Sequence, residues 1–364
     1  MGQLLSGPST SKDSGDGESA QMGLLWCYSG MQGWRERMED SHLAISSLGL
    51  RPPGDSPATP SNGWENTAVF AVMDGHGGEH VAQFCQRHLP IELMRERPQD
   101  AGAALVNAFH RMDELLADPS NLSELQSMSN DPLPSFKSWK VSPENVGCTA
   151  VVCCVRPDSL TVANAGDSRA VLCRWGKAID MSEDHKPNLP GELARIQRAG
   201  GSIVEQRVAG TTHYRVNGNL NLSRSIGDLL YKQNPNLAPE DQMIACHPDI
   251  QHFWRQAGDE FMVIACDGVW DVLSSQDVCD FIRPRLGNLN DLPQRLQEGS
   301  FRLSSITEEL LDTCLSPDLS QTMGLGGDNM TIVLVIFGSG QRQDSWLDAS
   351  QVLVGGPSFL CPYK

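Results

Sequence analysis

Residues 70–78 read Phe-Ala-Val-Met-Asp-Gly-His-Gly-Gly. The four apolar residues are typical of a buried strand, and the acid follows where such a strand would end. The same pattern recurs in residues 261–268, which read Phe-Met-Val-Ile-Ala-Cys-Asp-Gly. A third acid, Asp328, comes just before the apolar run Met330–Phe337. The sequence therefore predicts several buried strands, each with a carboxylate at one end.

Carboxylates at the ends of buried strands need a partner. An unpaired charge is costly there, and several like charges raise one another's pKa values. A divalent cation removes this repulsion, and sites rich in carboxylate oxygens suit hard ions such as Mg²⁺ and Mn²⁺. A single Asp-Gly pair usually marks an ordinary β-turn. Because the pattern recurs at Asp74, Asp267 and Asp328, we favour a metal site.

Short apolar runs typical of strands recur along the chain, and longer segments with helical periodicity are clustered between them. Strands are expected at Ser41–Ser47, Thr67–Met73, Cys148–Val155, Ser159–Ala163, Ala170–Cys173, Phe261–Cys266 and Met330–Phe337. Helices are expected at Glu79–Glu96, Ala101–Ala117, Gly191–Ala199, Ser275–Arg285 and Arg302–Leu315. Successive strands are often joined by short turns of Gly, Asp or Asn, which favours antiparallel pairing. The pattern predicts an α+β protein with a large sheet system.

The composition excludes several classes of protein. The 364 residues carry a formal net charge of −17, which opposes nucleic-acid binding through a basic surface. The 11 cysteines include no C-x-x-C pair, so a zinc ribbon or disulfide framework is not expected and a reducing compartment is indicated. The chain has no apolar run of about 18 residues and no secretory pattern. We therefore expect a cytoplasmic protein.

Three segments are expected along the chain. Residues 1–21 are polar and rich in Ser and Gly, which predicts a flexible N-terminal arm. Residues 22–340 show no long break in composition and predict one folded domain, followed by a C-terminal tail over residues 341–364. Within the domain, Leu50–Glu65 and Asp118–Asn145 are expected to be surface insertions.

The first residues, Met-Gly-Gln-Leu-Leu-Ser, match the pattern for N-myristoylation at Gly2. One acyl chain gives only marginal membrane binding, and the arm has no polybasic segment that would strengthen it. We therefore expect membrane association that is weak at most. We also expect the protein to be a monomer.

A series of motifs carries a family resemblance. In order they are Arg35–Asp40, Phe70–Gly78, Gly147–Ala150, Ala163–Arg169, Asp184–Pro187, Arg195–Gly201, Leu222–Asp228, Cys266–Asp271 and Gly327–Met330. Together the ordered set resembles the metal-dependent serine/threonine protein phosphatases of type 2C. The resemblance spans roughly residues 30–338 and makes residues 22–340 the catalytic domain.

The resemblance implies a fold and a reaction. Members of this family have a β-sandwich of two antiparallel sheets flanked by helices, in the layer order α-β-β-α, with a two-metal cleft at one end. The implied function is hydrolysis of phosphoserine and phosphothreonine in phosphorylated proteins by a water or hydroxide that bridges two Mg²⁺ or Mn²⁺ ions. Some members hold a weaker third ion.

The resemblance also implies metal ligands. Asp74 matches the bridging ligand, with Asp267 and Asp328 on one ion and Glu39 and the carbonyl of Gly75 on the other. Further matches are Asp40, which would hold a metal-bound water, Asp167 and Asp271, which would hold the third ion, and Thr149, which lies near that outer site.

Two cationic side chains complete the implied site. Arg35 would bind the phosphoryl oxygens, since a guanidinium suits bidentate contact. His76 matches the residue that protonates the departing Ser or Thr oxygen. Arg224 matches a motif position beside the cleft without an assigned role, and residues 184–206 resemble a flap that shapes substrate access.

Two alternatives compete with this interpretation. Cys279 and Arg285 have the C-x5-R spacing of cysteine-based phosphatases, but the segment lacks a glycine-rich phosphate cradle. A catalytically inactive scaffold of the same fold that binds phosphoproteins is the remaining alternative. The presence of Asp74, Asp267 and Asp328 speaks against it.

Overall fold

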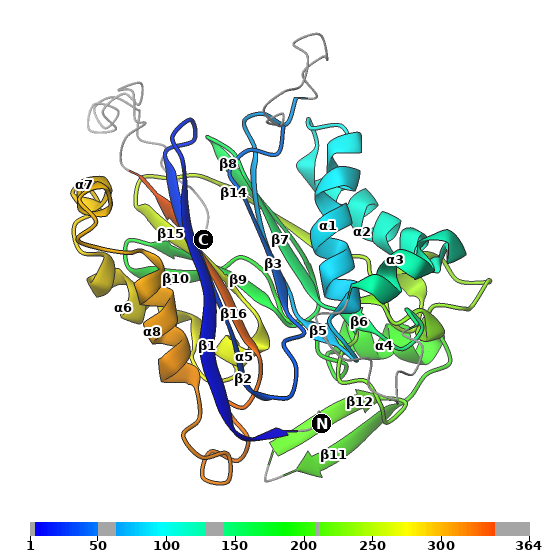
Figure 1. The fold of residues 1–364 in the computed structure, drawn as a ribbon. Helices are drawn as coiled ribbons and strands as arrows, with labels where there is room; N and C mark the ends of the chain where they lie inside the picture. Colours follow the sequence, from blue (N-terminus) through cyan, green and yellow to red (C-terminus); the bar gives the residue numbers. More distant parts are fainter. Residues whose placement is uncertain (1–3, 50–62, 129–141, 209–210, 339–364) are drawn as a thin grey trace, which may run out of the picture.

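The computed structural model describes residues 4–49, 63–128, 142–208 and 211–338. Two antiparallel sheets stack face to face, and helices cover the outer face of each sheet (Figure 1). This α-β-β-α sandwich confirms the expected fold class.

The sandwich has a six-stranded and a five-stranded sheet. The first has the order β1-β2-β16-β15-β9-β10 and consists of β1 (Leu4–Ser19), β2 (Leu24–Arg35), β9 (Arg169–Arg174), β10 (Lys177–Asp180), β15 (Asp259–Ala265) and β16 (Met330–Phe337). The second has the order β14-β8-β7-β4-β3 and consists of β3 (Ser41–Ile45), β4 (Ala68–Met73), β7 (Ala150–Val155), β8 (Ser159–Ala165) and β14 (Asp249–Trp254).

Helices pack on both outer faces. The second sheet is covered by α1 (His80–Arg95), α2 (Ala101–Ala117) and α3 (Leu122–Ser127). The first sheet is covered by α5 (Asp267–Trp270), α6 (Ser275–Leu286), α7 (Leu292–Gln297) and α8 (Ser304–Cys314).

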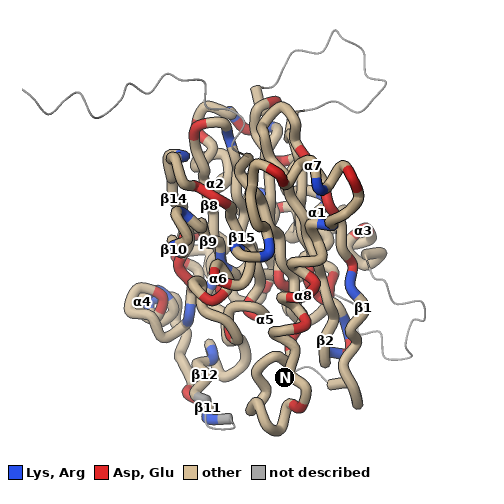
Figure 2. Tube along the Cα trace, turned by 90° about the vertical axis from the view of Figure 1, so that its left-hand side faces the viewer, with Lys and Arg blue, Asp and Glu red and all other residues tan. Residues whose placement is uncertain are grey.

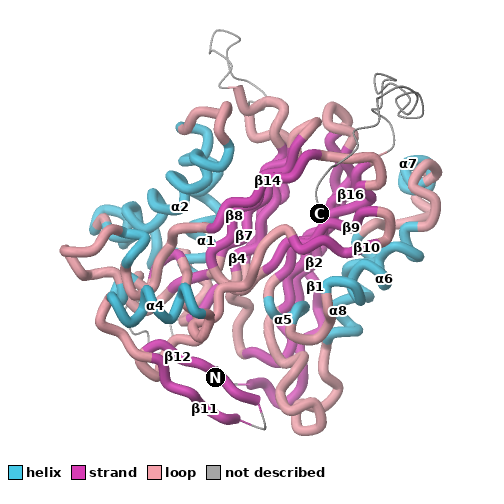
Figure 3. Tube along the Cα trace, turned by 180° about the vertical axis from the view of Figure 1, so that it is seen from behind, coloured by secondary structure: helices cyan, strands magenta, loops and turns pink. Residues whose placement is uncertain are grey.

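Two smaller sheets lie at one end of the sandwich. One has the order β13-β6-β5 and consists of β5 (Gly75–His76), β6 (Gly147–Cys148) and β13 (Ile226–Gly227). The other is the hairpin of β11 (Ile203–Val208) and β12 (Thr211–Val216). The hairpin lies beside α4 (Pro190–Arg198), as Figures 1 and 3 show, and the two share a small apolar cluster that includes Ile196 and Val216.

Strand β4 is apolar throughout because both of its faces are buried. All six of its residues are buried. Val69, Ala71 and Met73 pack on the helical side, whereas the alternate residues face the other sheet. Because both faces are covered, the strand has no polar positions, and the usual alternation of polar and apolar residues is lost.

The predicted elements are largely confirmed. Each of the five expected helices is present, and so is each expected strand, with small shifts at the ends. The expected strand Cys148–Val155 is divided, because β6 ends at Cys148 and β7 begins at Ala150. The residue between them, Thr149, contacts the candidate site described below.

The predicted flexible N-terminal arm is wrong for residues 4–19. This segment forms β1, which pairs with β2 along the edge of the first sheet. The polar composition of this segment does not indicate a strand. The strand is nevertheless stable because its backbone pairs with β2 and its side chains reach α8. Asp16 accepts hydrogen bonds from the N–H groups of Leu303 and Ser304, both at 2.8 Å.

Other expectations fall partly outside the described residues. Residues 50–62, 129–141 and 341–364 take in most of the two expected insertions and the whole C-terminal tail. The described part of Asp118–Asn145 contains a 3₁₀ helix at Pro119–Asn121 and the helix α3. Within the described ranges, no helix is long and apolar enough to cross a bilayer.

Two features of composition agree with the structure. The cysteines that the structure describes are all free and buried, as expected without a disulfide framework. Acidic residues are spread over the elements seen in Figure 2, which is consistent with the net charge of −17.

Candidate metal centre

Strand ends from both sheets meet at one end of the sandwich. In the second sheet, the first residue of β3 pairs with Met73, so Asp40 and Asp74 lie next to each other. In the first sheet, β15 ends shortly before Asp267, and its partner β16 begins shortly after Asp328. The two stacked sheets therefore each contribute carboxylates to the same end.

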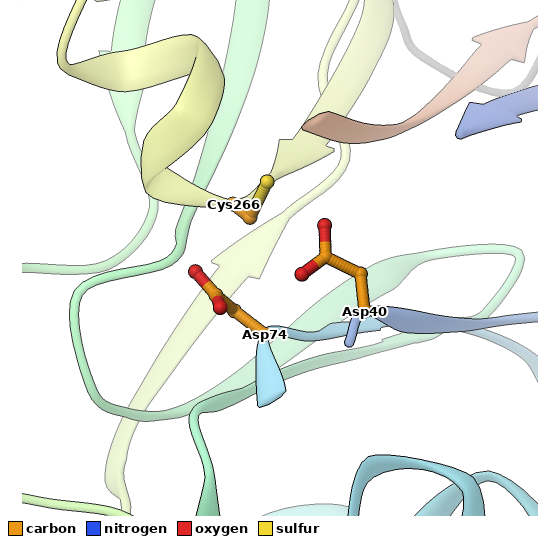
Figure 4. A group of neighbouring side chains, drawn as sticks. All are labelled: Asp40, Asp74 and Cys266. Atoms are coloured by element: carbon orange, nitrogen blue, oxygen red, sulfur yellow. The ribbon is translucent and has the colours of Figure 1, made fainter. Parts of the chain in front are cut away.

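The tightest group in this region is formed by Asp40, Asp74 and Cys266, whose ligand-type atoms all lie within 4.8 Å of one another. Figure 4 shows the three side chains pointing toward one another from positions next to the ends of β3, β4 and β15. The Cys266 thiol donates to the carbonyl of Asn329 at 3.5 Å and accepts from the N–H of Thr331 at 3.2 Å. Burial and the nearby carboxylates keep its pKa well above the ordinary value, so Cys266 packs as a neutral thiol.

The pKa values of the carboxyl groups show that the other predicted acids belong to the same cluster. Burial raises the pKa of Asp74 well above its ordinary value, and Asp40, Asp267 and Asp328 raise it further. Burial also raises the pKa of Asp40 to about 7, although a hydrogen bond from Thr331 opposes the shift. The pKa of Asp267 is raised by burial and by its acidic neighbours. Without a cation, such groups favour the protonated form.

Asp328 is held by a basic side chain. The Arg35 guanidinium forms an ion pair with the Asp328 carboxylate, and the other carboxylate oxygen accepts from the N–H of Asn329 at 2.7 Å. This orientation explains why Asp328 is not in the group around Asp74, although the two interact electrostatically.

Two residues fix the backbone beside Asp74. Thr149 Oγ1 accepts from the Asp74 N–H at 3.2 Å, and the Thr149 N–H donates to the Asp74 carbonyl at 2.9 Å. A Cβ at Gly75 would lie 2.2 Å from the carbonyl oxygen of Glu39. Only glycine at this position lets the segment that carries Glu39 approach Asp74 so closely.

An outer group of acids lies around Lys186. Its ammonium is 2.6 Å from Oδ2 of the buried Asp167 and also interacts with Asp267 and Asp271. Burial alone would lower the pKa of Lys186, but these acids raise it. The structure therefore brings together Asp167 and Asp271, the two acids predicted for the outer site. It also places the Lys186 ammonium beside them, which was not predicted from the sequence.

Comparison with known proteins identifies the family. Residues 27–323 match the family model described as protein phosphatase 2C. Probable protein phosphatase 2C 11 of Oryza sativa is 38% identical, and the match covers 98% of this chain and 96% of that relative. Probable protein phosphatase 2C 3 of Paramecium tetraurelia is 39% identical, and the match covers 92% of this chain and 99% of that relative. The chain belongs to the protein phosphatase 2C family.

Solved structures agree on the fold. A phosphatase from Toxoplasma gondii superposes with a TM-score of 0.63 at 24% identity, covering 90% of this chain and 96% of the other. A sex-determining protein from C. elegans gives a TM-score of 0.60 at 22% identity and covers 92% of this chain and 65% of the other. Family membership makes this protein phosphatase 2C a metal-dependent serine/threonine phosphatase, and the inactive-scaffold alternative is not favoured.

The residues of this phosphatase 2C chain fit a divalent cation. Asp40, Asp74, Asp267 and Asp328 are all half-buried, so solvent reaches them, and their oxygens are the donors that Mg²⁺ and Mn²⁺ prefer. The neutral thiol of Cys266 does not add a competing soft ligand. A cation would also relieve the repulsion that raises the carboxyl pKa values.

His76 has a partner that sequence reasoning missed. Its Nε2 lies 2.7 Å from Oδ2 of Asp228, whose side chain is 3% exposed. Nδ1 of His76 is buried and has no hydrogen-bond partner among the described residues. Asp228 belongs to a motif that supports the family resemblance, but nothing in its local sequence indicates a contact 152 residues away.

Arg224 is also placed by the structure. Its guanidinium contacts Glu192 at 2.8 Å and Asp249 at 2.7 Å. Glu192 lies on α4, so Arg224 links this helix of the predicted flap to the start of β14. These contacts indicate a structural role.

Proposed function

We propose that Glu39, Asp40, Asp74, Asp267 and Asp328 surround two Mg²⁺ or Mn²⁺ ions, and that phosphoserine and phosphothreonine of proteins are hydrolysed beside them. The carbonyl of Gly75 completes the predicted ligand set, and Asp167 and Asp271 hold a weaker third ion. The observation that carries the proposal is the convergence of carboxylates from both sheets, with pKa values raised by burial and by one another.

When bound, the two ions would supply a nucleophilic water at neutral pH and neutralise charge on the phosphoryl group. The chain itself supplies the anionic pocket and the positive charge beside it. Arg35 now pairs with Asp328. If bound cations neutralised that carboxylate, the guanidinium would be free to contact the phosphoryl oxygens, for which its planar fork is suited.

His76 is the proposed general acid. As the phosphorus–oxygen bond breaks, the imidazolium gives the proton on Nδ1 to the departing Ser or Thr oxygen, which leaves as the alcohol. Nδ1 is assigned because Nε2 is already held by Asp228. Water added to phosphorus balances the reaction, so the products are the free hydroxyl side chain and inorganic phosphate.

Access to the site depends on the flap. The predicted flap, residues 184–206, contains α4 and part of β11. We propose that this region shapes which phosphoproteins reach the acids.

A metal-dependence assay tests the proposed function. Purified protein is given phosphothreonine and phosphoserine peptides with Mn²⁺ or Mg²⁺, and phosphate release is measured with and without EDTA. Phosphate release that requires the metal and is insensitive to okadaic acid is the expected result. If the protein binds phosphopeptide with metal present but releases no phosphate, the scaffold alternative is correct.

N-myristoylation at Gly2, a monomeric state and a cytoplasmic location with some membrane association remain predictions. Residues 1–3 lie outside the described residues. Coexpression with an N-myristoyltransferase followed by intact-mass measurement tests the acylation, with Gly2→Ala as the control.

A further inference from the structure

The three-stranded sheet β13-β6-β5 brings Asp228 to His76. His76 is the last residue of β5 and pairs with Gly147 of β6, which in turn pairs with Gly227 of β13. Asp228 follows directly after β13. Its carboxylate reaches across the central strand to the imidazole, where Oδ2 lies 2.7 Å from Nε2.

Gly147 provides the space for this contact. A Cβ at this position would lie 2.4 Å from Oδ2 of Asp228 and 2.8 Å from Nε2 of His76. The φ of Gly147 lies outside the left-handed region, so the backbone conformation does not require glycine. The missing side chain therefore serves the contact between Asp228 and His76 rather than the turn.

Asp228 is held in one conformation. Its φ is 50°, a left-handed value that Asp tolerates better than most residues. Its N–H donates to the carbonyl of Val146 at 3.0 Å, and Ser225 Oγ donates to Oδ2 at 2.5 Å. Backbone strain of this kind persists only where the surroundings fix it, and it is often found at functional sites.

A second acid supports the same loop without touching His76. Asp113 on α2 accepts from the N–H of Gly227 at 2.8 Å and from the Lys232 ammonium at 2.6 Å. Lys232 also donates to the Ser225 carbonyl at 2.7 Å. Asp113 therefore anchors the segment from Ser225 to Lys232. The Asp228 carboxylate contacts the imidazole and Ser225.

We propose that Asp228 is the positioning residue of His76: by holding Nε2 it fixes the ring and leaves the unpartnered Nδ1 as the nitrogen that can give a proton to the oxygen that leaves phosphorus. The inference rests on the proposed function of His76 as general acid. A positioning role and a purely structural role for Asp228 predict different effects on substrates with different leaving groups. A general acid matters for a poor leaving group such as an alkoxide, whereas p-nitrophenolate leaves without a proton.

The test compares two substrates in Asp228→Asn. With Mn²⁺ present, we expect kcat on a phosphothreonine peptide to fall about 10- to 100-fold, within the contribution of a general acid. Hydrolysis of p-nitrophenyl phosphate should fall less than about threefold, because its leaving group needs little assistance. Calorimetric Mn²⁺ binding should be unchanged, which separates the effect from damage to the metal centre.

Two further variants sharpen the experiment. His76→Ala/Asp228→Asn should be no slower on the peptide than His76→Ala, because residues that act as a unit are not additive. Asp113→Asn is the matched control: it weakens the same loop without touching His76, so any loss should be equal on both substrates. Gly147→Ala should reproduce the substrate-selective loss by separating the pair, and it replaces Asp228→Asn if that variant does not fold.

Three results would overturn the inference: equal losses on both substrates in the folded variant, an unchanged kcat on the peptide, or additive losses in the double variant. A wild-type protein that hydrolyses neither substrate with Mn²⁺ would instead overturn the proposed function itself.

Discussion

At the scale of single residues, Asp267 bears most directly on the metal centre. It follows β15, and its pKa is raised by burial and by Asp167, Asp328 and Asp271. We expect Asp267→Asn to lower turnover about a thousandfold or more, since lost cation binding costs several kcal/mol of transition-state stabilisation. The metal-free variant should nevertheless unfold at a higher temperature than wild type near neutral pH, because Asn avoids the free-energy cost of protonating a buried carboxyl that is ionised in the unfolded chain.

Steady-state kinetics with saturating Mn²⁺ and thermal unfolding in EDTA measure the two effects. Asp280→Asn, on the exposed side of α6, is the control and should leave both unchanged. Wild-type activity in Asp267→Asn would show that the ligand assignment is wrong.

The residues differ in how far their roles could be predicted from sequence. Asp74 and Asp267 are predictable because each directly follows an apolar run, so that local pattern alone places them at a strand end. Asp228, Lys186 and Cys266 are not predictable in this way. Their roles depend on contacts such as the one across Gly147, which arise only when β5, β6 and β13 come together.

At the scale of elements, β1 shows the limit of composition as a guide. Strands that are apolar on both faces, such as β4 and β15, can be predicted from sequence because most of their side chains are apolar and buried. In β1 the side chains are mostly polar, and the strand is held by hydrogen bonds to β2. The backbone groups that pair along a sheet edge leave no signal in hydrophobic periodicity.

A single substitution tests how β1 is anchored. The Asp16 carboxylate accepts from two N–H groups at the start of α8 and so satisfies donors that have no partner within the helix. We expect Asp16→Ala to lower the free energy of unfolding by about 1 kcal/mol, the usual cost of losing a helix cap. Amide hydrogen exchange should rise in β1 and in the first turn of α8. Asp13→Ala, an exposed change on the same strand, should have neither effect.

At the scale of the whole molecule, the acid cluster makes metal-free stability depend on pH. The Asp40 carboxyl has a pKa of about 7 in the folded chain, against about 3.9 when unfolded. Its stabilising contribution is therefore complete below about pH 4 and is lost as the pH rises through 7. Asp74 and Asp267 act in the same direction.

The measurable window lies between about pH 6.5 and 8.5. His42, His80 and His247 have lowered pKa values, from burial first. In the unfolded chain they are half protonated near pH 6.5 and neutral well above it, so they oppose the loss only at the lower end of this interval. Urea unfolding in EDTA should give a smaller free energy of unfolding at pH 8.5 than at pH 6.5. A free energy that rises over this interval would contradict the assigned clustering of carboxyl groups.

Cations should reverse that loss and join the two halves of the sandwich. Asp40 and Asp74 come from the second sheet, whereas Asp267 and Asp328 flank strands of the first, so an ion held by both pairs binds only the folded arrangement. At a free concentration 100 times the dissociation constant, each site adds about 2.7 kcal/mol to the free energy of unfolding. Millimolar Mn²⁺ should therefore raise the unfolding temperature at pH 8.5, and EDTA should cancel the rise. The shift should be much smaller in Asp267→Asn and absent when NaCl of equal ionic strength replaces the manganese. If Mn²⁺ stabilised wild type and Asp267→Asn equally, the cation would be binding elsewhere. The acids of the two sheets would then not be joined by a shared cation.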